Sequence, residues 1–198
     1  MIFPMPLFRD ISHDTKETYT LTEGEQCVFF LLNRPGSITF TLTGKDAAAH
    51  VVAIYTIHNH DTLTGSITQV HQSPETTSSF IGRSILFDSA HLDWQGLVRI
   101  EEKAVRSEGR QEIHSLLLSP HTTVHAIPSL EIANDDVRCG HAATTKGSTL
   151  LSQQSRSLTY TSDPSAYRRL PERCSRETPD RCRPKKPPAY ASPSLIPK

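Results

Sequence analysis

The feature that most constrains the fold is a series of short stretches in which polar and apolar residues alternate. From Ser37 to Thr43 the alternation is strict, as in a β-strand with one buried face. Similar stretches recur every ~8 to 14 residues between Thr18 and Ile132, a spacing typical of all-β domains. The helical period of about 3.6 residues is not found before Thr145. The sequence therefore predicts an all-β fold and argues against βαβ architectures.

Further strands are expected at residues 26–32, 51–58, 64–70, 82–87, 96–100, 113–118 and 122–127. Residues typical of turns separate them at 34–36, 44–46, 59–61, 73–75 and 108–109. The alternation predicts an inward-facing apolar set, and Trp94 is expected to pack at a corner of the fold. The expected core residues are Ile38, Phe40, Leu42, Ile85, Phe87, Val98, Ile100, Leu116 and Leu118.

Motifs for nucleotide binding and for serine hydrolases are missing from the chain. It has neither a Gly-x4-Gly-Lys-Ser/Thr loop nor a Gly-x-Ser-x-Gly elbow. Asp135 and Asp136 are adjacent, so in a strand they would point to opposite faces and could not work as a general acid and base pair. We therefore predict that the chain is not an enzyme.

Charge and composition divide the chain into two parts. Residues 1–145 hold 10 basic and 17 acidic side chains, a net charge of −7, whereas residues 146–198 hold 11 basic and 4 acidic, a net of +7. The second part has eight of the fourteen prolines and only six Leu, Ile, Val or Phe residues, too few to offset the entropy of ordering. We predict a lead-in at residues 1–17, a β core at 18–145 and a disordered basic tail at 146–198.

The same composition bears on the cellular compartment. No apolar run reaches the ~18 residues that a membrane-spanning helix needs, and the first residues do not resemble a secretory signal. The cysteines, at positions 27, 139, 174 and 182, form neither a Cys-x-x-Cys pair nor a dense disulfide framework. We expect a cytoplasmic protein without a membrane partner. The tail has few aromatic residues among its basic ones, which argues against a nucleic-acid partner.

One segment combines two metal-ligating residue types. Cys139 and His141 are two residues apart, so in a strand both side chains project from the same face, with Gly140 between them. A thiolate and an imidazole suit iron, zinc or an iron–sulfur species better than magnesium or calcium. Two ligands do not complete a coordination sphere, so a partner would have to supply the others. The alternative is a buried cysteine beside a solvent-facing histidine.

A second histidine pair offers a different interpretation. His58 and His60 would share one face of a strand and resemble the His-x-His of cupins, small β-barrels that bind metal through His and Glu. The cupin spacing calls for a Glu about four residues further on, where this chain has Thr64. The competing interpretation of the pair is a polar strand end.

The segment around Cys139 resembles the SufD branch of the SufB/SufD family of iron–sulfur cluster assembly scaffolds. The matching residues read Leu-Glu-Ile at 130–132, Asp-Asp-Val at 135–137 and Cys-Gly-His-Ala-Ala-Thr at 139–144. Upstream matches lie at residues 76–80, 96–100, 116–119 and 127–128, and at Ala104 and Gln111. The resemblance covers roughly residues 65 to 145, in the family's order and spacing.

The resemblance implies a right-handed parallel β-helix that pairs with a SufB-like subunit and contacts a SufC-like ATPase. A transient iron–sulfur cluster or iron would then form at the subunit interface, with none bound by this chain alone. His141 matches the family histidine that faces a SufB cysteine, and Cys139 matches a cysteine that either tunes the site or packs beneath it. Glu131 would either line the site or pair with a basic residue inside the coil stack. A second copy of this chain is the alternative partner.

The chain also departs from the family pattern. Gly140 and Ala142 flank His141, where the family has Ser and Gly. After Thr145, family members continue with amphipathic helices that dock the ATPase, whereas residues 146–198 are rich in Arg, Pro and Ser. The abrupt change suggests either a shifted reading frame in the gene model or a genuine disordered basic arm.

Overall fold

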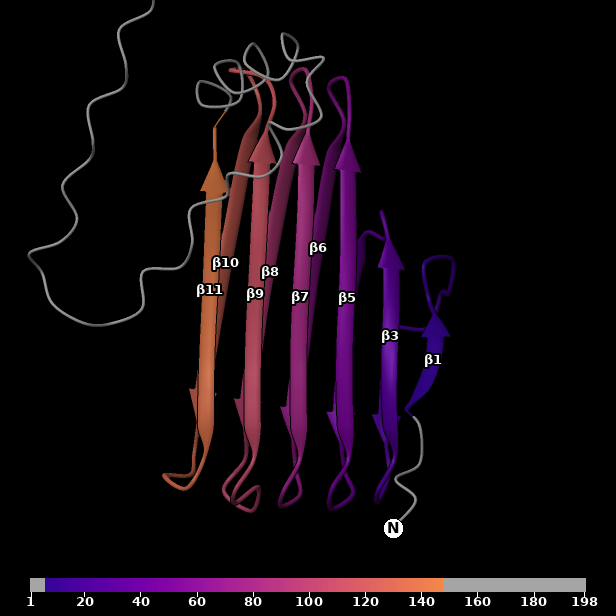
Figure 1. Ribbon diagram of the computed structural model, residues 1–198, viewed down its shortest axis with the longest axis vertical. Helices are drawn as coiled ribbons and strands as arrows, with labels where there is room; N and C mark the ends of the chain where they lie inside the picture. The colour runs from indigo at the N-terminus through magenta and orange to yellow at the C-terminus, as the bar shows by residue number, and fades with distance from the viewer. Residues whose placement is uncertain (1–5, 148–198) are drawn as a thin grey trace, which may run out of the picture. The chain divides into compact units, whose positions relative to one another are not determined.

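The computed structural model describes residues 6–147, and within them the chain forms parallel β-strands in two facing sheets (Figure 1). The six-stranded sheet has the order β1-β3-β5-β7-β9-β11, and the five-stranded sheet has the order β10-β8-β6-β4-β2. The strands are β1 (Leu7–Asp10), β2 (Thr18–Leu21), β3 (Gln26–Leu32), β4 (Gly36–Leu42), β5 (Ala48–Ile57), β6 (Thr62–His71), β7 (Thr77–Leu86), β8 (His91–Ile100), β9 (Glu108–Leu117), β10 (Thr123–Ile132) and β11 (Arg138–Lys146).

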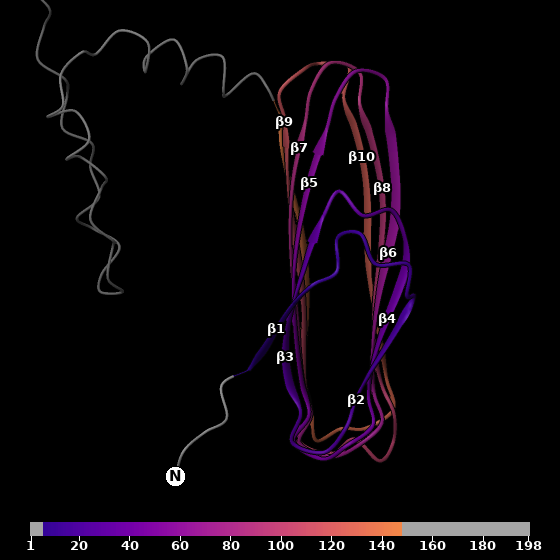
Figure 2. The ribbon, with the colours of Figure 1, turned by 90° about the vertical axis from the view of Figure 1, so that its right-hand side faces the viewer.

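Successive strands alternate between the two sheets, so the chain winds as a flattened solenoid (Figure 2). Ala48 pairs with Thr77, Thr77 with Glu108 and Glu108 with Arg138, so each coil repeats after about 30 residues. Because the pairing is parallel and in register, an inward residue of one coil stacks on an inward residue of the next. The predicted parallel β-helix is therefore confirmed.

Large apolar side chains fill the space between the sheets. Tyr19, Phe29 and Phe40 pack together in the first coils, with ring centroids 4.8 to 5.5 Å apart. Further along, Phe80 of β7 stacks on Trp94 of β8 with centroids 5.0 Å apart. Trp94 is fully buried in the middle of its strand, so its predicted place at a corner is wrong.

The predicted core is only partly correct. Ile38, Phe40, Leu42, Val98 and Ile100 are buried as expected. Ile85 and Leu116 lie on the outer faces of β7 and β9, and Phe87 and Leu118 directly follow the ends of these strands; all four are only partly buried or exposed.

The inward positions beside these four residues belong to their sequence neighbours. Ser84 and Ser115 are buried between the sheets, where the Ser84 hydroxyl donates to the Ser115 hydroxyl at 2.7 Å. Because serine is polar, the sequence pattern did not mark these positions as inward. The predicted set of inward residues is therefore shifted by one residue in β7 and β9. The expected turn at residues 108–109 is also wrong, because both residues lie in β9.

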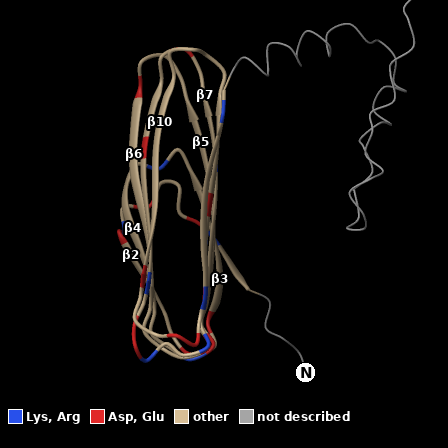
Figure 3. Cartoon of the chain, turned by 90° about the vertical axis from the view of Figure 1, so that its left-hand side faces the viewer, with Lys and Arg blue, Asp and Glu red and all other residues tan. Residues whose placement is uncertain are grey.

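Turn residues stack at the ends of the coils. Asp46, Glu75 and Arg106 each adopt a positive φ, between 55° and 60°, at the same turn of successive coils. Their backbone N–H groups donate to Pro74, Val105 and Asp136 of the next coil. Glu75 also forms ion pairs with Lys45, at 3.1 Å, and with Arg106. Charged residues accordingly gather at this end of the solenoid (Figure 3).

The first coil is closed by its own residues. Arg34 is buried and donates to the carbonyl oxygens of Ile11, at 2.9 Å, and Lys16, at 2.6 Å. Strand β1 lies inside the expected lead-in of residues 1–17 and pairs with β3.

At the other end of the solenoid, β11 pairs with β9 and β10 pairs with β8, and neither β10 nor β11 has a second neighbouring strand among residues 6–147. The predicted tail lies outside the described residues from 148 onwards, so the choice between a frame shift and a disordered arm stays a prediction.

Candidate functional site

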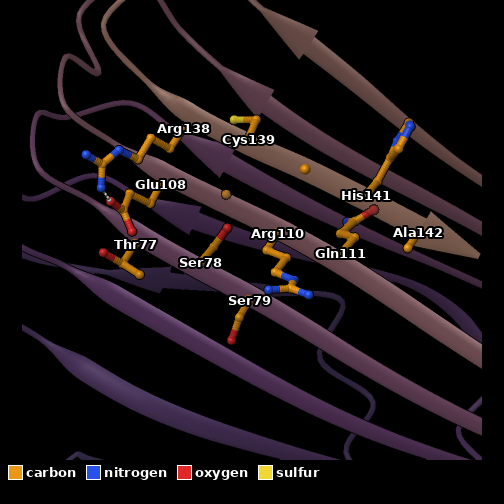
Figure 4. Close-up of a pocket in the computed structure, with 12 residues that line it drawn as sticks. Thr77, Ser78, Ser79, Glu108, Arg110, Gln111, Arg138, Cys139, His141 and Ala142 are labelled. Atoms are coloured by element: carbon orange, nitrogen blue, oxygen red, sulfur yellow. Dashed lines mark hydrogen bonds and ion pairs between the residues drawn. The ribbon is translucent and has the colours of Figure 1, made fainter. Parts of the chain in front are cut away.

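Cys139 and His141 lie side by side on β11, the last strand of the six-stranded sheet. Cys139 pairs with Gly109 and His141 with Gln111, both of which face the interior of the solenoid. The two side chains therefore project from the inward face of β11, on the same side of the strand (Figure 4). Their placement on one strand face agrees with the sequence expectation.

His141 remains exposed although its position is an inward one. The reason is that β10 and β11 form the last described coil, so no further coil covers the interior there. The free edge of β11 carries backbone N–H and C=O groups that another strand could pair with. The imidazole thus lies at an open rim, beside a strand edge that no other strand of residues 6–147 pairs with.

Cys139 is more enclosed than His141. It packs against a small apolar cluster that contains Val98, Ile100 and Ala104. A Cβ at Gly109 would lie only 2.6 Å from Val98 Cγ1 and 3.6 Å from Cys139 Sγ, so the glycine makes room for this packing. Burial raises the pKa of the Cys139 thiol, which favours the protonated form at neutral pH.

A buried imidazole lies beneath this end of the site. His71 Nδ1 is 2.8 Å from the Thr76 hydroxyl, and its Nε2 is 2.8 Å from the Ser78 hydroxyl. The Thr76 hydroxyl also lies 2.8 Å from that of Ser107. Burial lowers the pKa of His71 to about 4, so the ring is neutral at pH 7.

His71 belongs to no motif in the sequence, so nothing around it distinguishes it from the other isolated histidines. The only usable signal was its even spacing from Ile67, an inward residue of the same strand. A neutral imidazole held between two hydroxyls, rather than a charged one, is what a dry interior tolerates.

Two glutamines add buried amides to the same interior. Gln111 of β9 reaches across to the other sheet and donates to the carbonyl oxygens of Ile67, at 3.2 Å, and Leu97, at 3.1 Å. Gly96 leaves space for this amide, because a Cβ there would lie 2.3 Å from Gln111 Oε1. Gln69 is fully buried, and neither its amide nitrogen nor its amide oxygen has a partner among the described residues.

Glu131 lies away from Cys139 and His141. It is an exposed residue of β10 whose Oε2 is 2.6 Å from Arg99 Nε of the preceding coil. Glu131 was expected either to line the site or to pair with a basic residue inside the coil stack. It does pair with a basic residue, Arg99, but this ion pair lies on the outer surface. The expected location inside the coil stack is wrong because Glu131 occupies an outward position of its strand.

His58 and His60 do not form the expected strand pair. Both are exposed in the turn between β5 and β6, and Asn59 between them has a φ of 58°, which ends the extended conformation. The His58 ring stacks on Phe87, with centroids 4.4 Å apart. Because the fold is an open solenoid and not a small barrel, the cupin-like alternative is wrong.

The metal-ligating residues of the described chain do not converge into a complete site. No group of three or more His, Cys, Asp or Glu side chains suited to a metal ion occurs within residues 6–147. Cys139 and His141 could therefore supply at most two ligands from this part of the chain, and the exposed imidazole is the one within reach of another molecule.

Comparison with known proteins identifies similar chains. Residues 35–148 match the family described as SUF system FeS cluster assembly, SufBD core domain. The iron–sulfur cluster assembly protein SufD of Escherichia coli is 30% identical over 74 residues, which is 37% of this chain and 18% of that protein. A SufBD family protein of Staphylococcus saprophyticus is also 30% identical over 74 residues, 37% of this chain and 16% of the relative.

A plant relative extends the comparison. The chloroplastic protein ABCI7 of Arabidopsis thaliana is 30% identical over 101 residues, 50% of this chain and 21% of that protein. The matches thus span only about a fifth of the length of these relatives. Residues 6–147 contain no helix long and apolar enough to cross a membrane.

Proposed function

This chain belongs to the SufBD family of SUF-system iron–sulfur cluster assembly proteins, and we propose on that premise that it acts as a non-catalytic scaffold subunit. In this proposal His141 is presented at the open rim of the solenoid to a SufB-like partner. A nascent cluster, or the iron that enters it, is the cargo at the interface. The partner supplies the thiolate ligands and the sulfide.

The observation that carries the proposal is the position of His141. Its ring is exposed, lies on the inward face of the last described coil and borders the free edge of β11. A partner strand that adds to this edge would bring its own side chains alongside the imidazole. A neutral imidazole nitrogen can ligate iron, and completing the sphere from a second chain makes binding depend on assembly.

The structure supports different roles for the two ligand candidates. Cys139 packs on Val98 and over Gly109, and its thiol pKa is raised, so the thiolate that iron requires is disfavoured. We therefore assign cargo binding to His141 and a packing role beneath it to Cys139.

The partners follow from the family. We propose a SufB-like subunit at the β11 edge and a SufC-like ATPase that drives remodelling of the interface, with a second copy of this chain as the alternative to the SufB-like subunit. A cytoplasmic location accords with these partners.

Anaerobic reconstitution tests the proposal. The full chain is combined with a SufB-like and a SufC-like protein, and iron and acid-labile sulfide are measured after gel filtration. His141→Ala should lower both per complex without preventing association, and Cys139→Ala should retain most of the cluster if packing is its role. His125→Ala is the matched control, because His125 is also exposed on an edge strand but faces outward from β10. Equal cluster content in the His141→Ala and His125→Ala complexes would remove His141 from the mechanism.

A further inference from the structure

A second feature lies on the opposite face of β11. A hollow of about 510 Å³ runs along β7, β9 and β11. All of its lining residues belong to these three strands and none to the five-stranded sheet, so it opens on the outer surface of the six-stranded sheet. Cys139 and His141 are also among its lining residues, although their side chains project from the inward face of β11, so the hollow adjoins the site proposed above (Figure 4).

Gly140 keeps this hollow open. It pairs with Arg110 of β9, and a Cβ at Gly140 would meet no atom within 4 Å. Arg138 and Ala142 are its outward neighbours on β11, two residues away on either side. The missing side chain leaves free space between the arginine of β9 and the arginine of β11.

The two arginines keep most of their donors free. Arg110 Nη2 donates to Glu112 at 3.1 Å, and Arg138 Nη1 donates to Glu108 at 3.1 Å. A guanidinium has five N–H donors, so one bond to a carboxylate leaves the others available. The side chains of Arg110 and Arg138 are 73% and 86% exposed, which allows both to turn toward the hollow.

The carboxylates nearby do not neutralise the cluster. Glu112 is shared between Arg110 and Arg83, at 3.1 Å each, and also lies 2.7 Å from His114 Nε2. Of the charged side chains that line the hollow, Arg110 and Arg138 are basic and Glu108 is acidic, a net of +1. This excess stands out because residues 1–145 as a whole carry a net charge of −7.

Hydroxyl groups face the arginines from the far side of the hollow. Thr77 and Ser79 are outward residues of β7, and the Ser79 hydroxyl is 2.8 Å from His50 Nδ1. Hydrogen-bond donors thus come from β7 on one side and from β9 and β11 on the other. Guanidinium forks match the oxygens of phosphate and carboxylate groups, and donors on several sides favour a tetrahedral anion.

We propose that this hollow binds a small tetrahedral oxyanion of the phosphate class. Arg110 and Arg138 are its charged ligands, the β7 hydroxyls are additional donors, and Gly140 is the position that admits the anion. The proposal does not depend on iron–sulfur chemistry, because none of these side chains takes part in the scaffold function proposed above.

Isothermal titration of the full chain with inorganic phosphate at constant ionic strength tests the site. We expect saturable binding at one site, weakened about tenfold or more by Arg110→Gln and by Arg138→Gln, as expected for the loss of a charge-assisted hydrogen bond. Gly140→Val should abolish binding while leaving both arginines in place. Arg99→Gln is the matched control, because Arg99 is exposed and ion-paired on the opposite sheet, and it should leave the affinity unchanged.

Two outcomes would overturn the proposal. Equal weakening by Arg99→Gln and Arg110→Gln would mean that general surface charge attracts the anion. Succinate binding as tightly as phosphate at the same ionic strength would mean that the hollow does not select a tetrahedral anion. Neither the phosphate affinity nor the succinate affinity depends on iron. This proposal can therefore fail while the scaffold proposal holds, and the scaffold proposal can fail while this one holds.

Discussion

Protonation of His71 should couple the stability of the solenoid to pH. The ring is buried with both nitrogens bonded to hydroxyls, and burial lowers its pKa from 6.5 to about 4. Because the pKa is lower in the folded state, the unfolded chain takes up the proton first as the pH falls. The stabilisation is fully present above pH 6.5 and is lost progressively between pH 6.5 and about 4.

The size of this effect follows from the two pKa values. The interval from 6.5 to about 4 corresponds to about 3 kcal/mol, since one pKa unit is worth ~1.4 kcal/mol. That is a large part of the ~5 to 15 kcal/mol by which domains are usually stable. His71→Gln removes the titration while keeping a polar side chain at the position.

The assay is urea unfolding of the full chain, followed by circular dichroism from pH 7.5 to 4. Other groups also titrate in this range, so the informative quantity is the difference in unfolding free energy between wild type and His71→Gln at each pH. We expect this difference to shrink by up to about 3 kcal/mol as the pH falls. His125→Gln, at an exposed position of β10, serves as the control and should follow the wild type. A difference that stays constant across the range would refute the assignment of a buried neutral His71.

Three further changes test the packing. Gly109→Ala should destabilise the chain by about 1 to 3 kcal/mol, because the new Cβ would lie 2.6 Å from Val98 Cγ1. Gly65→Ala is the control, because its Cβ would meet its nearest atom at 3.7 Å, and it should change the free energy of unfolding little. Equal urea midpoints for the two variants would contradict this prediction. Gln69→Met should be neutral or stabilising in the same assay, since its buried amide has no partner within residues 6–147, and a large loss would reveal a missed one. Glu131→Gln should leave both the urea midpoint and the cluster content unchanged, because its ion pair is exposed; a drop in cluster content would place Glu131 at the site.

The strand phase shows where sequence reasoning stopped. The regular alternation of residues 37–43 predicted the inward set Ile38, Phe40 and Leu42 correctly. In β7 and β9 the inward positions include Ser84 and Ser115, and the apolar neighbours Ile85 and Leu116 lie outside. Apolar alternation alone cannot assign these strands, because the pairing with the adjacent coils sets which face turns inward.

The chain by itself determined the features that depend on neighbouring residues. The period of alternation specified β-strands, and the spacing of two residues placed Cys139 and His141 on one strand face, since side chains in a strand repeat with period two. Only the tertiary structure decided that His141 is exposed at an open rim while Cys139 is packed, and that His71 lies buried beneath them. Those properties depend on which coils stack above and below each residue. The stacking is made by strand pairs between residues about 30 positions apart in the sequence.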